Sequence, residues 1–254
     1  MKQTQTFFAV IILCSLLLFS NISAISPEFA KKNNLKTVNY YGIPKNIASV
    51  GSDKCYEFLG PKLKETDDFL INPTNSFGLT NAQIEKMTKD AMNTWELYNK
   101  NIFGTLTVDP TATIDTSGDK SFIYFNKDSK LPDFIPAETT AYFLEDELIG
   151  SNIELNAKHF VFGDYTQNQE ITDYQGILTH ELGHDLGLGD VYSFSNFTKC
   201  QGNTMGSANG YEGAYDLRTL EFGDKFGVFI LYSNLAKYAK YKDYFMIKQI
   251  KYYK

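Results

Sequence analysis

The sequence predicts one main α+β domain in which helices pack against a sheet of short strands. Of its 254 residues, 43% are hydrophobic and 15% are aromatic, which is enough apolar side chain for a sizeable core. An apolar stripe with helical spacing follows residue 80, and further along lie short segments rich in aromatic and β-branched residues. This composition excludes a largely disordered chain.

Three helices are expected. Thr80 and Gln83 have the spacing of a capping box, in which each side chain satisfies a free amide of the first helical turn. A second helix is expected over 173–188, where Gly187 and Gly189 allow the chain to turn away, and a third over 220–236. The apolar stripe of the first helix, in steps of three and four residues, consists of Ile84, Met87, Ala91, Trp95 and Tyr98.

The expected strands are separated by Gly, Pro, Asp and Asn residues, and they cover 69–71, 105–108, 121–125, 141–144 and 152–155. The folded domain should therefore extend over 55–236. Before it, residues 25–54 are polar and irregular, and we interpret them as a leader or short pro-segment without firm structure.

The first 24 residues predict a secretory signal peptide. Lys2 lies in a short polar start, an apolar run follows over 7–19, and small and polar residues end at Ala24. The apolar run is shorter than the roughly 20 residues that span a bilayer, which disfavours the alternative of a retained anchor. We expect cleavage after Ala24, a secreted protein, and no stable membrane insertion afterwards.

The charge distribution argues against nucleic acid as a partner. The formal net charge is −6, and it becomes −7 once Lys2 is removed, because 1–24 holds no other charged side chain. The C-terminal tail, 237–254, is different: six lysines and one aspartate among aromatic residues give it a local charge of +5. This tail either contacts acidic surfaces or packs as an additional solvated element.

The segment THELGHDLGLGD carries the candidate site. His180 and His184 are four residues apart on the expected second helix, so both rings project from one face. Zinc accepts imidazole nitrogen, and a catalytic zinc site has three protein ligands and one open position. A turn at Gly187 is expected to bring the Asp190 carboxylate to the same Zn²⁺ as the third ligand. Glu181 would then take a proton from an attacking water.

A bland alternative is a buried helix whose histidines bond to backbone groups. That alternative does not explain why two of only three histidines stand at ligand spacing. The extended pattern HExxHxxGxxD, followed by Met205 in the tetrapeptide NTMG, resembles the metzincin clan, in which a turn with a methionine lies beneath the metal. The segment RTLEFGDKFGVFILY and the pair Cys55–Tyr56 resemble matrixin-like members of that clan.

The resemblance implies a zinc-dependent endopeptidase acting on a protein or peptide substrate. It also implies a metzincin-like domain, with a twisted, mostly parallel five-stranded sheet, three helices and a zinc cleft. The substrate would lie antiparallel to an edge strand near Ala141, Tyr142 and Phe143. Two positions depart from the family pattern: Asp190 replaces the third histidine of vertebrate matrixins, and Ser207 stands where astacin-like and serralysin-like enzymes have tyrosine.

The mature chain keeps two cysteines, because Cys14 leaves with the signal peptide. In an oxidising compartment Cys55 and Cys200 suggest one disulfide. The alternative is a free Cys55 that binds the zinc in a latent form.

Other residues have both functional and ordinary interpretations. His159 could bind a second zinc or be an isolated histidine, and the acids 145–147 could hold a structural Ca²⁺ or form a solvated turn. Asp185 is expected to be structural, and 196–198 is a glycosylation sequon.

Two functions therefore remain open: a monomeric secreted endopeptidase, or a secreted binding or adhesion protein that keeps a structural zinc site and acts through its tail. Glu181 favours the first, since a structural site needs no base. The wall of the specificity pocket would come from 207–216.

Overall fold

The structure is a computed structural model of the chain. It describes residues 36–41, 55–59, 62–63, 66–97, 102–114, 120–144, 147–191, 200, 202–206 and 214–232. The expected signal peptide, basic tail, sequon and Ser207 lie outside the described residues, as do Tyr98, Glu145 and Asp146.

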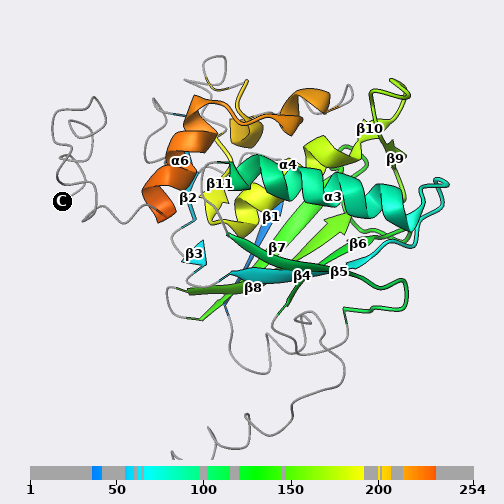
Figure 1. The fold of residues 1–254 in the computed structure, drawn as a ribbon, viewed down its shortest axis with the longest axis horizontal. Helices are drawn as coiled ribbons and strands as arrows, with labels where there is room; N and C mark the ends of the chain where they lie inside the picture. The colour runs from blue at the N-terminus through cyan, green and yellow to red at the C-terminus, as the bar shows by residue number, and fades with distance from the viewer. Residues whose placement is uncertain are drawn as a thin grey trace, which may run out of the picture.

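The main layer is a seven-stranded mixed sheet, and helices α3 and α4 lie across one of its faces (Figure 1). Neighbours among strands β5, β4, β6 and β8 run parallel, whereas β7 runs antiparallel to β8. Five strands follow one another in space: β5 (Phe103–Val108) at one edge, then β4 (Asp67–Asn72), β6 (Lys120–Phe125), β8 (Glu147–Leu155) and β7 (Ala137–Leu144).

The predicted α+β class is confirmed, and each expected strand falls within one of these five. The sheet nevertheless has two additional strands. The two-residue β3 (Lys62–Leu63) pairs parallel to β8, and β1 (Lys36–Tyr41) pairs antiparallel to β7. The prediction that 25–54 lacks firm structure is therefore wrong for β1. The β1 sequence KTVNYY holds Thr, Val and two Tyr, which favour strands, but the polar residues around it hide this short signal.

Helix α3 (Asn81–Glu96) begins at the predicted capping box, with both reciprocal bonds between Thr80 and Gln83 present. The four described residues of its apolar stripe are buried, and Trp95 is fully enclosed. The Trp95 indole donates to the Thr179 carbonyl oxygen at 2.8 Å. The stripe thus holds α3 against the helix that carries the candidate site.

That helix, α4 (Tyr174–Asp185), begins at Asp173, whose side chain accepts from the Gly176 amide. It ends three residues earlier than predicted. Gly187 has φ 92°, as the predicted turn requires, and the next two residues already form strand β11 (Leu188–Gly189). The remaining elements are β2 (Glu57–Phe58), which pairs with β11, β9 (Phe162–Gly163), β10 (Thr172–Asp173), η1 (Thr204–Gly206), η2 (Tyr215–Arg218) and α6 (Phe222–Tyr232).

The predicted disulfide between Cys55 and Cys200 is present, with their Cα atoms 5.1 Å apart. It connects the start of the domain to the segment that follows the candidate site. Since Cys55 is oxidised, the alternative in which its thiolate binds zinc does not apply to this structure.

Two carboxyl groups are buried between the sheet and α4. Asp67 of β4 accepts a short hydrogen bond from the Ser121 hydroxyl, whose oxygen lies 3.4 Å from Asp185 Oδ1. Burial and the charge of Asp185 raise the pKa of Asp67 well above its ordinary value, and burial raises the pKa of Asp185 to about 6. Asp185 is therefore turned toward the sheet, in agreement with a structural role.

This pair predicts a stability that falls as the pH rises. A carboxyl whose pKa is raised by folding gives its full stabilisation below its unfolded pKa, about 3.9, and loses it as the pH rises through the folded pKa. Asp67→Asn should therefore raise the free energy of unfolding of the metal-free chain by about 1–2 kcal/mol at pH 8 and by less at pH 5. Urea unfolding at both pH values, with the exposed Asp128→Asn as control, measures this. An unchanged pH slope would contradict the prediction.

Candidate metal centre

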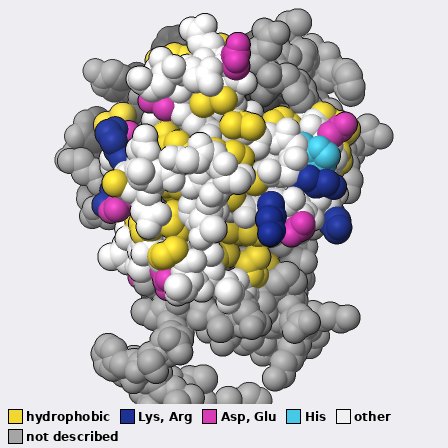
Figure 2. All heavy atoms as spheres, turned by 90° about the vertical axis from the view of Figure 1, so that its right-hand side faces the viewer, with side chains coloured by type: hydrophobic (Ala, Val, Ile, Leu, Met, Phe, Trp, Pro, Cys, Tyr) yellow, Lys and Arg dark blue, Asp and Glu magenta, His cyan; other side chains and the backbone are white. Residues whose placement is uncertain are grey.

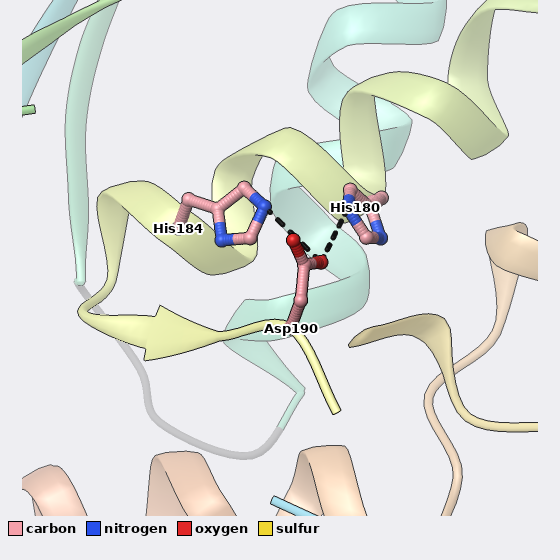
Figure 3. Close-up of side chains that lie close together, drawn as sticks. All are labelled: His180, His184 and Asp190. Carbon is pink, nitrogen blue, oxygen red and sulfur yellow. Dashed lines mark ion pairs between the residues drawn. The ribbon is translucent and has the colours of Figure 1, made fainter. Parts of the chain in front are cut away.

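Helix α4 presents two imidazole rings side by side. His180 and His184, one turn apart, are both buried, and their ring centroids are 4.9 Å apart (Figure 3). Burial of the whole helix against α3 and the sheet fixes the backbone that carries the rings.

The turn at Gly187 brings the third predicted ligand back to these rings. The Gly187 carbonyl oxygen accepts from the Leu59 amide at 2.9 Å, and β11 pairs with β2 directly afterwards. Asp190 follows β11, and its Oδ1 lies 3.2 Å from His180 Nε2 and 3.5 Å from His184 Nε2 (Figure 3). The structure thus brings together the three residues that the sequence singled out.

The other nitrogen of each ring contacts a backbone carbonyl. His180 Nδ1 lies 2.7 Å from the Thr204 oxygen, and His184 Nδ1 lies 2.9 Å from the Leu188 oxygen. A carbonyl only accepts, so each Nδ1 is assigned the proton and each Nε2 faces Asp190. Metal-binding histidines commonly have this arrangement, in which the second nitrogen is held by a carbonyl.

The two separations from Asp190 Oδ1 fit a tetrahedral metal ion. One ligand atom from each residue lies within 4.8 Å of the other two. Ligand atoms about 2.0–2.1 Å from a tetrahedral zinc are about 3.3 Å from one another, close to the two separations from Asp190 Oδ1. Asp190 Oδ1 is also buried, and among the described residues the two imidazoles are the polar groups that face it. The group is therefore suited to hold a cation.

In the metal-free chain a proton shared by His180 and Asp190 takes the place of a cation. Burial disfavours the imidazolium form of His180, but the hydrogen bond and charge of Asp190 outweigh it and raise the pKa of His180 to about 9. A bound cation would displace this proton, as metal ligands require.

Glu181 lies next to His180 but outside the ligand group. Its side chain is buried, and the Thr139 hydroxyl donates to its Oε2 at 2.5 Å. Burial raises the pKa of Glu181, although the two histidines and the Thr139 hydrogen bond act in the opposite direction. Sequence reasoning missed Thr139.

Met205, which the resemblance implies beneath the metal, packs against α4 at Gly183. Gly183 lies between the two histidines in the sequence. A Cβ atom added to it would be 2.3 Å from Met205 Sδ, so only glycine lets Met205 approach the helix this closely. Asp224 of α6 accepts from the amides of Thr204 at 2.8 Å and Met205 at 3.0 Å. Asp224 thereby fixes the turn whose carbonyl orients His180. Sequence reasoning had marked this segment as a helix without assigning Asp224 a role.

Glu57 is a second carboxyl near the ligands that sequence reasoning missed. It is paired with Gly189, the residue before Asp190. Burial, with a smaller contribution from the charge of Asp190, raises the pKa of Glu57 to about 7.

The remaining sequence predictions have mixed outcomes. His159 is exposed and joins no group of three ligands in the part of the chain that the structure describes. The calcium interpretation rests on Glu145 and Asp146, which lie outside it. Ala141, Tyr142 and Phe143 lie on β7, as expected, but β7 is not the outermost strand because β1 is paired along it.

On the face shown in Figure 2, basic and acidic side chains are interspersed and hydrophobic side chains form separate islands, so this face carries no broad basic patch among the described residues. None of the described helices is both long enough and apolar enough to cross a membrane. Comparison of the chain with models of protein families gives no match, and neither does a comparison with curated proteins.

Proposed function

We propose that the chain is a secreted zinc-dependent endopeptidase of the matrixin-like type. The observation that carries the proposal is the convergence of two histidine nitrogens and one carboxylate oxygen next to a buried glutamate that is not itself in the ligand group. A purely structural site has no need for such a base, which disfavours the binding-protein alternative.

Zinc is proposed because the donor set contains two imidazole nitrogens. Calcium and magnesium prefer sites made entirely of oxygen, whereas two nitrogens and one oxygen at tetrahedral spacing suit zinc. His180, His184 and Asp190 would hold the ion, which would polarise a substrate carbonyl as a Lewis acid.

The chain's own residues supply the proton transfers. Glu181 would take a proton from the attacking water and deliver it to the leaving amine, a role for which a raised carboxyl pKa is suited. Thr139 holds the Glu181 carboxyl in one orientation through its hydrogen bond. Asp224 and the Thr204 carbonyl fix the ring of His180.

The direct test is hydrolysis of a denatured protein by the purified chain loaded with zinc. Activity should disappear with a chelator and return with added zinc. A digest of a peptide library would then give the side-chain preference. Absence of cleavage by the zinc-loaded chain, after removal of the N-terminal segment that includes β1, would contradict the proposal.

Asp190 provides a separate test of the metal site. Asp190→Ala should weaken zinc binding at least about 10-fold, because removing a ligand should cost no less than removing the partner of a ligand. Competition with a chromophoric chelator measures the affinity, and the exposed Asp133→Ala is the matched control. Unchanged affinity would show that another residue provides the third ligand.

A further inference from the structure

Strand β1 occupies the side of β7 that faces away from the rest of the sheet. Its six residues pair antiparallel with β7, from Lys36 opposite Phe143 to Tyr41 opposite Glu138. The other side of β7 is paired with β8. Both edges of β7 are therefore engaged by the chain itself.

The pairing register brings β1 close to the candidate site. Tyr40 stands opposite Thr139, whose hydroxyl contacts Glu181 at 2.5 Å. Opposed residues of antiparallel strands have Cα atoms about 4.5–5.5 Å apart and lie on the same face of the sheet. The backbone of β1 therefore runs one strand spacing from the residue that orients the proposed base.

β1 is also a separable part of the fold. Its sheet partner is β7 alone, so its removal unpairs no other described strand. Residues 42–54 connect it to Cys55, which the disulfide with Cys200 anchors to the domain. A short tether of this kind maintains an effective concentration of about 1 mM at the site that the segment occupies.

We propose that Lys36–Tyr41 is an autoinhibitory strand that occupies the β7 edge in place of an extended substrate. This inference rests on the proposed function and on the expectation, from the resemblance, that a substrate lies antiparallel to the strand near Ala141, Tyr142 and Phe143. An extended polypeptide gains affinity from ladder hydrogen bonds to a sheet edge, and the same bonds are already made by β1. Displacement of the strand, after cleavage of its connection to Cys55 or by competition, opens the edge. The disulfide leaves no Cys55 thiolate to provide latency by binding zinc.

Two adjacent proline substitutions in the zinc-loaded full chain, Val38→Pro and Asn39→Pro, test the proposal. Adjacent residues of a strand direct their N–H groups to opposite sides, so only one of the two prolines removes a hydrogen bond to β7. That substitution is the ladder-breaking variant. The other proline replaces an N–H that points away from β7, which an edge strand does not need for pairing. Zinc content and the disulfide provide the check on folding. The readout is kcat/KM for a fluorogenic peptide.

The ladder-breaking variant should hydrolyse the peptide at least about tenfold faster than the unsubstituted chain, if the tether provides about 1 mM of a competitor that binds the edge with a Kd of about 0.1 mM. Its neighbour should change the rate much less. Added KTVNYY peptide should return the faster variant toward the original rate. Equal rates for all three chains would overturn the inference and leave the proposed function intact.

Binding in a Glu181→Ala background separates the two proposals. If no form hydrolyses the peptide, the proposed function fails, and the anisotropy of a labelled peptide then tests the strand alone. Tighter binding to the ladder-breaking variant supports occupation of the edge by β1. Equal binding to both proline variants and the unsubstituted chain overturns it.

Discussion

Glu181→Ala is expected to lower kcat for peptide hydrolysis by about 10³-fold while the chain still binds one zinc ion. Glu181 is on the same helix as His180 and His184, but the group of ligand atoms does not include it. Removing its carboxyl therefore takes away the proton acceptor and leaves the metal ligands. Its burial and the Thr139 hydrogen bond hold the carboxyl in one place, so another side chain cannot easily substitute for it.

Hydrolysis of a fluorogenic peptide and metal analysis of the same sample measure the two halves of this prediction. The experiment is best done in the ladder-breaking background, where the β7 edge is open. Glu170→Ala, at an exposed position, is the matched control and should keep full activity. Hydrolysis by Glu181→Ala at a normal rate would contradict the proposed mechanism. Loss of zinc from this variant would show that Glu181 contributes to metal binding and is not only a base.

The parts of the fold that the sequence predicted are those with local signals. The capping box at Thr80 and the apolar stripe that includes Trp95 are local signals, and α3 follows them. The ligand group was also predictable, because His180, His184 and Asp190 lie within one helix and the turn after it.

Residues that act across sequence distance could not be found in the same way. Thr139 reaches Glu181 of α4 from strand β7, and Asp224 reaches the Thr204 amide from α6. Each contact depends on how the elements pack, which neither spacing nor periodicity encodes. Strand β1 was missed for a different reason: its Thr, Val and Tyr residues favour a strand, but they lie within a longer polar segment that has no clear pattern.

The Cys55–Cys200 disulfide could be predicted only in part. Cysteine counting predicted the pair, whereas the structure shows which segments the bond holds together. The Cys200 carbonyl oxygen accepts from the Asn203 amide at 3.0 Å, in the turn that leads to Met205. A Cβ atom on Gly223 would be 1.9 Å from the Cys55 carbonyl oxygen, so the disulfide region also packs tightly against α6. The bond therefore anchors both the start of the domain and the turn beneath the metal site.

Replacing both cysteines by serine is expected to lower the free energy of unfolding by about 5 kcal/mol, the chain-entropy value for a loop of this size. The two residues are 145 positions apart, so the reduced chain regains a large amount of freedom when it unfolds. Urea unfolding of the zinc-loaded chain measures the loss, and a phosphine reductant should reproduce it in the unsubstituted protein. The same reductant should leave the doubly substituted chain unchanged, which controls for effects on the metal. Equal midpoints for the oxidised chain and the serine variant would show that the helices and sheet hold the turn at Met205 without the covalent bond.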